Sequence, residues 1–300
     1  MPEEGIVPIP HGEVLTYEEI LRTVRIAVQG GIRKVRLTGG EPLVRKGIIE
    51  FVRSLTEIHG LEQVAMTTNG VLLYEFAEDL RACGVKRLNI SLDSLNPEKF
   101  EHITRRDAFH KVMRGIELAE KLGFSPIKIN VVAVRGLNDD EILDFARLSL
   151  ERPYHVRFIE FMPMGESNHW SSERFISTAE IQDRITAIGP LRPMDHRLLD
   201  GPAERFVLEG SKGEIGFIGA LSHHFCSQCN RLRLTAAGGL RGCLFSDDEV
   251  DLRSALRGGA TDEYIMDLFE RAIASKPEGH GSSVDHPRNG SVLPMSSIGG

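Results

Sequence analysis

The sequence has few cysteines, no long apolar run and no excess of positive charge, and each absence excludes a class of protein. Only four of the 300 residues are cysteine, too few for a disulfide-stapled framework in a chain of this length. No stretch approaches the roughly 18 apolar residues of a membrane-spanning helix. The net charge of −7 gives no general attraction to nucleic acid or to a membrane surface. The opening MPEEG lacks the positive start of a secretory signal, so we expect a cytoplasmic protein.

Short apolar or β-branched runs alternate with segments that carry helix signals. This alternation predicts repeated βα units around a parallel sheet, in an α/β fold. The runs begin roughly 25 to 40 residues apart, close to the spacing in an eight-fold βα barrel, and five units predict a partial or open barrel. The functional site should then lie where the βα loops gather, at the carboxyl ends of the strands. The expected strands are 34–38, 64–68, 87–91, 128–134 and 155–161.

Four pairs of residues predict where helices begin. In a capping box, a polar side chain and an acidic residue three positions later satisfy each other's backbone donors. A cap residue followed by proline at the first helical position is a second start signal. The capping-box pairs are Thr16 with Glu19, Ser177 with Glu180 and, as the looser match, Asn138 with Glu141; Asn96 with Pro97 is the proline pair.

The pattern changes after about residue 165, which predicts a second and smaller α+β domain. The last segment is rich in Gly, Ser, Pro and His, a composition typical of a flexible tail. We expect a helix over 177–188 and short strands over 205–208 and 214–218, with domains over 1–164 and 165–275 and a tail over 276–300.

Cys226, Cys229 and Cys243 predict a metal site. Two thiolates at CxxC spacing can share a metal or cluster, and a third from the next strand leaves one coordination position without a cysteine. Zinc, with His223 or His224 as a fourth ligand, and an iron–sulfur cluster are both open on spacing alone.

Arg231 and Arg233 lie two residues apart beside the cysteines, in what looks like a strand. Side chains two apart on a strand leave the same face, and two guanidiniums together suit a phosphate or a carboxylate. A solvated strand face is the alternative, and the adjacent thiols favour the anion site.

Lys34, Arg36 and Thr38 have the same spacing on the first expected strand. If that face points into the barrel, its charges need an anionic ligand, because buried charge without a partner is costly. Lys128 and Arg157 on later strands could extend the patch. An edge strand with outward basic residues is the alternative.

Polar or glycine-rich sequences follow several expected strands. Gly39 and Gly40 would let the backbone approach a ligand without Cβ interference. The segments 67–70 and 89–94 place polar groups where βα loops contact ligands, although ordinary helix capping would use the same residues.

The chain contains, in order, the motifs TGGEP (38–42), TTNG (67–70), NISLD (89–93) and FIEFM (158–162), the three cysteines and a terminal Gly-Gly. Together these motifs resemble those of the GTP 3',8-cyclase family of the radical S-adenosylmethionine superfamily. The resemblance favours iron over zinc. It implies radical cyclisation of GTP to (8S)-3',8-cyclo-7,8-dihydroguanosine 5'-triphosphate, the first step of molybdenum cofactor biosynthesis, initiated by a 5'-deoxyadenosyl radical.

The resemblance also implies a role for each matching residue. A 4Fe-4S cluster on Cys226, Cys229 and Cys243 would bind the guanine of GTP, and the terminal diglycine would reach into the active site. Arg231, Arg233, Gly299 and Gly300 are the catalytic candidates. The implied GTP contacts are Lys34, Arg36, Thr67, Lys128, Arg157, Arg231 and Arg233, and the implied S-adenosylmethionine contacts are Gly40, Ser91 and Met162.

One departure concerns the start of the chain. The family carries a CxxxCxxC loop that binds a second 4Fe-4S cluster, and in its members a sequence like MPEEG follows that loop, whereas here MPEEG begins at Met1. We expect a start codon placed too late rather than a truncated protein, and expect the chain as written not to generate the radical.

The implied partners are GTP, a reductant of unknown identity and, downstream, cyclic pyranopterin monophosphate synthase. A homodimer is left open. No nucleic acid or membrane partner is expected.

Overall fold

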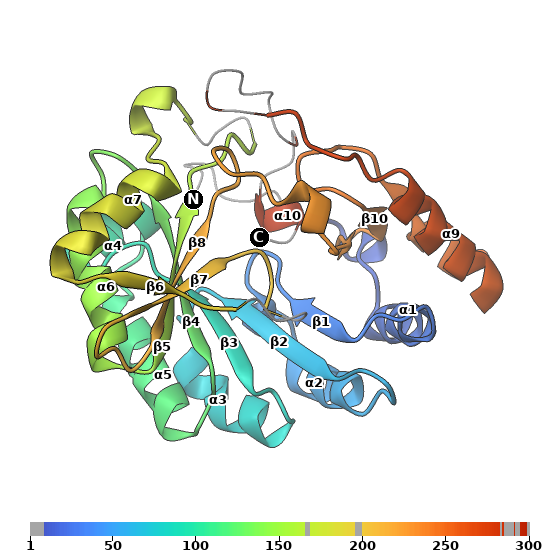
Figure 1. The fold of residues 1–300 in the computed structure, drawn as a ribbon. Coiled ribbons are helices and arrows are strands. Elements are labelled where there is room, and N and C mark those ends of the chain that lie inside the picture. The colour runs from blue at the N-terminus through green and yellow to red at the C-terminus, as the bar shows by residue number, and fades with distance from the viewer. Residues whose placement is uncertain are drawn as a thin grey trace.

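The main feature of the fold is a curved eight-stranded sheet (Figure 1). The computed structural model describes residues 9–165, 169–195, 200–282, 284, 291 and 295–298. The strand order is β1-β2-β3-β4-β5-β8-β7-β6; β1 to β5 and β8 are parallel, and β7 and β6 finish the sheet antiparallel. The strands are β1 (Lys34–Leu37), β2 (Gln63–Thr68), β3 (Arg87–Ser91), β4 (Ile127–Ala133), β5 (Tyr154–Glu160), β6 (Leu191–Pro193), β7 (Glu204–Leu208) and β8 (Glu214–Ile218).

Helices follow the parallel strands, as repeated βα units require. All five expected strands and both later ones are confirmed to within a residue at either end. The expected helix over 177–188 ends its α-helical part earlier and closes with a 3-10 turn over 186–188. The helices are α1 (Tyr17–Gln29), α2 (Ile48–Thr56), α3 (Leu73–Ala82), α4 (Pro97–Thr104), α5 (Phe109–Lys121), α6 (Ile142–Glu151), α7 (Thr178–Ile185), α8 (Leu252–Arg257), α9 (Asp262–Ala274) and α10 (Met295–Ile298).

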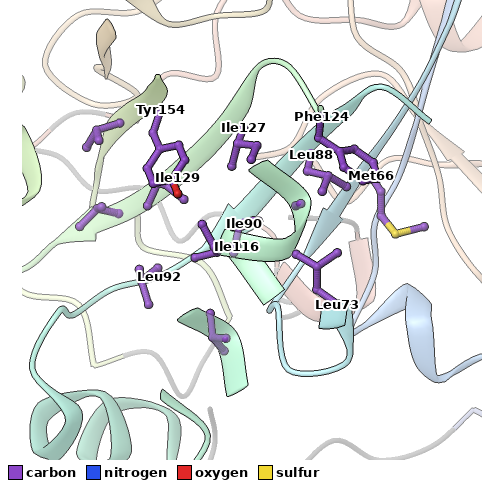
Figure 2. Packing of buried hydrophobic residues seen from close by; sticks show 14 of the residues in the cluster. Met66, Leu73, Leu88, Ile90, Leu92, Ile116, Phe124, Ile127, Ile129 and Tyr154 are labelled. Atoms are coloured by element: carbon purple, nitrogen blue, oxygen red, sulfur yellow. The ribbon is translucent and has the colours of Figure 1, made fainter. Parts of the chain in front are cut away.

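The helices cover one face of the sheet with an apolar core. Leu88, Ile90, Ile127 and Ile129 alternate along β3 and β4 and are at most 2% exposed. They pack in the same cluster as Ile116 of α5 (Figure 2). Because side chains alternate across a strand, burying these residues turns the residues between them toward the other face of the sheet.

Three of the four predicted helix starts have a side-chain cap at the expected residue. Thr16 Oγ1 accepts from the backbone of Glu19, and the Glu19 carboxylate accepts from the Thr16 backbone at 2.7 Å, which completes the capping box. Asn96 caps α4 through the Lys99 backbone. The third, Ser177, caps α7 through the Glu180 backbone, while the Glu180 carboxylate pairs with arginines instead.

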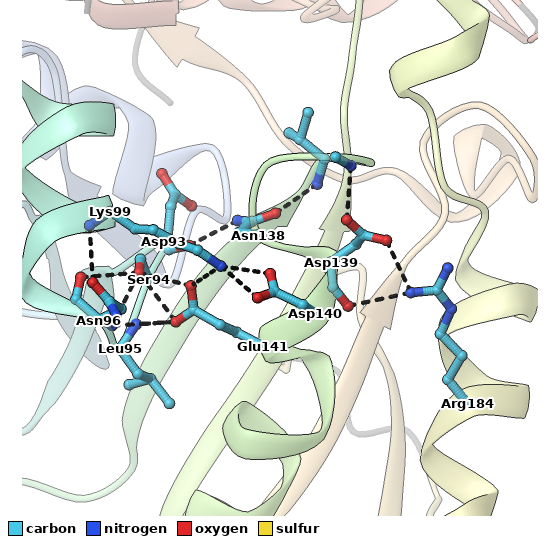
Figure 3. A network of polar contacts seen from close by, with 12 residues as sticks. Asp93, Ser94, Leu95, Asn96, Lys99, Asn138, Asp139, Asp140, Glu141 and Arg184 are labelled. Atoms are coloured by element: carbon cyan, nitrogen blue, oxygen red, sulfur yellow. Dashed lines mark hydrogen bonds and ion pairs between the residues drawn. The ribbon is translucent and has the colours of Figure 1, made fainter.

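The capping pair predicted for Asn138 and Glu141 is wrong. The Asn138 amide instead accepts from the Val134 backbone and donates to the Asp93 carbonyl. Glu141 is buried and points away from its own helix (Figure 3). Its carboxylate accepts from the Ser94 hydroxyl and from two backbone N–H groups of the loop between β3 and α4. Both side chains therefore form hydrogen bonds with the β3–α4 loop and the end of β4 in place of the cap at their own helix start.

A second unit contains a three-stranded antiparallel sheet of β9 (Arg233–Leu234), β10 (Gly239–Arg241) and β11 (Val250–Asp251). Its apolar core includes residues of α8 and α9. Helix α1 contributes Ile26 to this core and Val24 to the core of the main sheet. The first helix of the chain is therefore shared by both units. No helix within the described ranges is long and apolar enough to cross a membrane.

Glu141→Gln should lower the free energy of unfolding by about 2 kcal/mol, because an amide NH2 would face backbone donors that now meet a carboxylate. Urea denaturation would measure the loss. Glu151→Gln, on the exposed end of the same helix, is the control and should change stability by less than about 0.5 kcal/mol. Equal stability of the two variants would contradict the role given to Glu141.

Candidate active site

The face of the sheet opposite the helices carries polar and cationic side chains. The parallel register aligns Thr67 with Asn89, Asn89 with Lys128, and Lys128 with His155. Arg157 lies two residues beyond His155, so it leaves the same face. The sheet thus brings together four predicted ligands from four strands, Arg36, Thr67, Lys128 and Arg157, with Lys34 beside Arg36.

Strand β1 is at the end of the described sheet, yet its basic residues do not point outward. Lys34 and Arg36 align with residues 63 and 65, which precede Thr67 by steps of two. Their side chains therefore join the polar face. Burial, followed by the charges of Arg36 and Arg87, lowers the pKa of Lys34 to about 8. The alternative of a solvated basic edge does not describe this strand.

Lys128 and Arg157 are almost completely buried. Burial, followed by the charges of Arg157 and Lys34, lowers the pKa of Lys128 to about 7. The Arg157 guanidinium donates to the amide oxygens of Asn130 at 2.9 Å and Asn89 at 2.7 Å. Within the described part of the chain, neither cation forms an ion pair with a carboxylate. Neutral amides thus hold Arg157 in place without cancelling its charge.

Two buried polar atoms on this face have no hydrogen-bond partner among the described residues, the Nε of Arg36 and the hydroxyl of Thr67. Buried polar groups are nearly always paired, and an orphan at a concave site needs an explanation. Positive charge and unused donors together fit an anion with several acceptor oxygens, such as a phosphate chain.

The predicted S-adenosylmethionine contacts lie along the carboxyl ends of the strands. Gly40 follows β1, Ser91 ends β3, and Met162 follows β5. The loops after β1 and β2 are joined by Glu41, whose carboxylate accepts from the Thr68 hydroxyl at 2.9 Å and the Asn69 backbone at 2.7 Å. The glycine turn is therefore held at the edge where a parallel α/β sheet binds its ligands.

Residues 219–243, between β8 and the last of the three cysteines, are here called the cysteine segment. It contains a 3-10 turn in which the Cys229 N–H donates to the Cys226 carbonyl at 3.1 Å. Burial opposes ionisation of Cys229, but Arg231 and then Lys276 reverse the effect and lower its pKa to about 7. About half of this thiol would therefore be thiolate at neutral pH, the form that binds metal.

Cys243 lies two residues after the end of β10, and both Cys229 and Cys243 act electrostatically on the Arg233 guanidinium. No set of three Cys, His, Asp or Glu side chains in the described ranges is already gathered around a metal position. Three thiols, one with a lowered pKa, are nevertheless the donor chemistry of an iron–sulfur cluster. The residues fit the cluster as a donor set rather than as a preformed cage.

Arg231 is not on a strand with Arg233, so that prediction is wrong. Strand β9 begins at Arg233, and the Arg231 guanidinium instead lies over the Phe225 ring at 4.9 Å. Arg231 nevertheless acts electrostatically on both Arg36 and Arg233, so the charges of the three arginines remain coupled. The turn at the cysteines is irregular, and strand periodicity could not be extended through it.

Glu160, which the sequence reasoning missed, ties β5 to the start of the cysteine segment. It is fully buried, and its carboxylate accepts from the backbone of Thr178 at 2.9 Å, Leu221 at 2.8 Å and Ser222 at 3.0 Å. The one signal was an acidic residue inside the apolar FIEFM run, since a buried carboxylate must be paired. Met162 and Cys226 thus lie on either side of one anchored junction.

Residues after α9 return to the cysteine segment. Lys276 Nζ donates to the Cys229 and Arg231 carbonyls, and the His280 ring contacts the Ala220 carbonyl at 2.9 Å. Buried Arg241 binds the Ser291 hydroxyl at 3.1 Å. The sequence patterns predicted none of these contacts. The catalytic candidates Gly299 and Gly300 lie outside the described residues.

Gly242 places Cys243 against the end of α9. A Cβ at this position would lie 2.7 Å from the Ala272 carbonyl oxygen and 3.4 Å from Lys276 Cβ. A contact of 2.7 Å with backbone cannot be relieved by a side-chain rotation. The close approach of β10 to α9 therefore depends on glycine.

Two family models together match most of the chain. The model described as the Radical SAM superfamily matches residues 5–149, and the model described as Molybdenum Cofactor Synthesis C matches residues 154–282.

Curated relatives match over the whole chain. The GTP 3',8-cyclase of Thermodesulfovibrio yellowstonii is 51% identical over 302 residues, which covers 100% of this chain and 92% of the relative. That of Syntrophomonas wolfei is 47% identical, with 97% of this chain and 87% of the relative covered. Among solved structures, a radical SAM methyltransferase from Sphaerobacter thermophilus is 22% identical, with a TM-score of 0.46 over 58% of this chain and 54% of that chain.

Sulfate, which does not titrate near neutrality, should bind this face more weakly as the pH rises. Binding requires protonated Lys128, whose pKa is about 7, so affinity should fall by up to about tenfold per pH unit above that value. Calorimetry between about pH 6 and pH 8 would measure it. Lys128→Met should bind weakly with a flatter profile, while exposed Lys46→Met should keep the original profile. An unchanged profile in Lys128→Met would contradict the assignment.

Gly242→Ala should lower the free energy of unfolding by about 1–3 kcal/mol, because its methyl group would overlap the Ala272 carbonyl. Thermal or urea denaturation would measure the change. Gly279→Ala is the matched control, since a Cβ there meets nothing within 4 Å. A tolerated alanine at 242 would show that β10 and α9 are not in the close contact described.

Proposed function

We propose that this chain, which belongs to the GTP 3',8-cyclase family of the radical S-adenosylmethionine superfamily, cyclises GTP to (8S)-3',8-cyclo-7,8-dihydroguanosine 5'-triphosphate in the first step of molybdenum cofactor biosynthesis. The observation that carries the proposal is the buried cationic face with two polar atoms, Arg36 Nε and the Thr67 hydroxyl, that bond nothing in the part of the chain that the structure describes. A triphosphate supplies both the negative charge and the acceptor oxygens that this face lacks.

In this proposal the substrate spans the site from the sheet to the cysteine segment. The triphosphate would lie against the cations of β1, β4 and β5, and the guanine would lie at the cysteine segment. Arg231 and Arg233 would link the two parts, since each is coupled electrostatically to both Arg36 and the thiol of Cys229. The proposed GTP contacts are Lys34, Arg36, Thr67, Lys128, Arg157, Arg231 and Arg233.

Cys226, Cys229 and Cys243 would hold a 4Fe-4S cluster, with the open coordination position directed to the substrate. Arg231 would keep Cys229 in the thiolate form that such a cluster requires. Lys276 fixes the turn between these residues through two backbone carbonyls. The chain's own part in binding is thus to supply thiolate ligands in a site already biased toward negative groups.

Gly40, Ser91 and Met162 would hold S-adenosylmethionine at the carboxyl edge of the sheet. This cofactor, with an iron–sulfur cluster and an electron donor, supplies the radical chemistry when bound. The residues of this chain position the ribose of GTP against it and exclude water. Glu41 and Glu160 hold the loops that carry these contacts.

We also propose the division into residues 1–164, 165–275 and 276–300, with helix α1 shared between the first two cores. The terminal Gly299-Gly300 would enter the site from the tail. The proposed setting is the cytoplasm, where thiols stay reduced. The proposed partners are a reductant, the downstream synthase and a second copy of the chain.

Cys229→Ser should lose iron and sulfide on anaerobic reconstitution, because the alcohol is a poor cluster ligand. Cys83→Ala, in the apolar core, is the control and should retain both. With the in-frame codons upstream of Met1 included, the unchanged protein should form 5'-deoxyadenosine and consume GTP, and the serine variant should lose GTP consumption. Stoichiometric zinc without iron would instead indicate a structural metal, and deoxyadenosine formation stimulated by a compound other than GTP would reassign the substrate.

A further inference from the structure

A short segment from Asp200 to Ala203, here the Asp200 segment, lies against the polar face of the sheet, which carries Lys34, Arg36, Lys128 and Arg157. Lys128 Nζ lies 3.4 Å from the Asp200 carbonyl oxygen, to which it donates. A Cβ on Gly201 would lie 4.0 Å from an Arg36 nitrogen, and Ala203 is 3% exposed. The segment therefore touches the cations that the proposed function assigns to the triphosphate.

A chain of charged groups anchors this segment to the sheet. The Asp200 carboxylate accepts from Arg205, whose guanidinium also donates to Glu214 through two bonds of 2.8 Å and 2.7 Å. Glu214 in turn lies 3.2 Å from His155 Nδ1. These side chains come from β7, β8 and β5 and are at most 21% exposed. Asp200 is thus held by a built scaffold.

The anchor lies at the amino-terminal end of the parallel strands. Lys128 and His155 are each the second residue of their strands, and Glu214 is the first residue of β8. The predicted cofactor contacts, such as Ser91, lie at the opposite, carboxyl end. The cavity among these groups has a volume of about 10 Å³, room for roughly one water. The Asp200 segment closes this end of the polar face.

The charge of Asp200 acts on the same cations. It raises the pKa values of Lys34 and Lys128, whereas the neighbouring arginines lower both. A negative ligand on this face would act in the same direction. A phosphate that approaches the closed end therefore meets a fixed negative charge that already uses part of the available attraction.

We propose that Asp200 marks the closed end of the polar face along which the phosphates would lie, and that its charge weakens binding of the outermost phosphate of the nucleotide. This inference rests on the proposed function for the identity of the nucleotide. With the guanine at the cysteine segment, as proposed above, the terminal phosphate of a triphosphate is the part that would lie nearest Asp200, and a diphosphate would end short of it.

Asp200→Asn should tighten binding of GTP by about fivefold or more, because one repulsive charge is removed beside the terminal phosphate. Binding of GDP should change by less than about twofold. Calorimetry on the anaerobically reconstituted protein would measure both. Tripolyphosphate, which needs the polar face but no guanine site, should also bind about fivefold more tightly. Equal gains for GTP and GDP would overturn the proposal.

Two further variants separate charge from shape. Asp200→Glu keeps the charge and should leave the ratio of GTP to GDP affinity as in the unchanged protein. Asp195→Asn makes the same change in net charge at an exposed position and should leave every affinity within about twofold. If Asp195→Asn reproduces the gain of Asp200→Asn, the proposal fails. If tripolyphosphate responds as expected but GTP does not bind, the role of Asp200 stands and the GTP assignment fails.

Discussion

Uncompensated positive charge on the inner face of the parallel sheet is the constraint on which the other features of the site depend. Arg157 and Lys128 are buried where solvent cannot screen them, and neither pairs with a carboxylate among the described residues. Such charge destabilises the free protein unless a ligand neutralises it. The apolar core on the helix side must therefore supply enough stability to hold a face that is favourable only when an anion is bound.

The partners of Arg157 show how this balance is kept. Asn89 and Asn130 satisfy the geometry of the guanidinium with neutral oxygens, so its position is fixed while its charge stays available. A carboxylate in either place would stabilise the free protein and weaken anion binding by the same interaction. Asp200 is an acid whose charge does act on this face, and the Arg205 guanidinium holds its carboxylate at the closed end of the face.

Features that depend on local periodicity could be predicted from the sequence, whereas features that depend on competition between distant groups could not. The strands and the Thr16 cap depend on neighbouring residues alone, and both are confirmed. Asn138 and Glu141 matched a cap by spacing, but both side chains bond a loop 45 residues away: the Asn138 amide donates to the Asp93 carbonyl, and the Glu141 carboxylate accepts from the Asn96 backbone. The packing of α1 is a second such feature, because Ile26 contacts a core formed by residues of the last third of the sequence, which no local pattern indicates. The facing of the cations could be predicted from alternation and parallel register, but the anchoring by Glu160 and Arg205 could not.

The two halves of the site are coupled through Arg231. Its charge lowers the pKa of the Cys229 thiol, and it also lowers the pKa values of Arg36 and Arg157 by repulsion. A thiolate at Cys229 therefore offsets part of the positive potential that a phosphate would otherwise meet. A 4Fe-4S cluster held by three thiolates would also be a negative group at this place. Arg231 would therefore face negative charge with or without the cluster, and the attraction for a phosphate chain comes from the cations of the sheet.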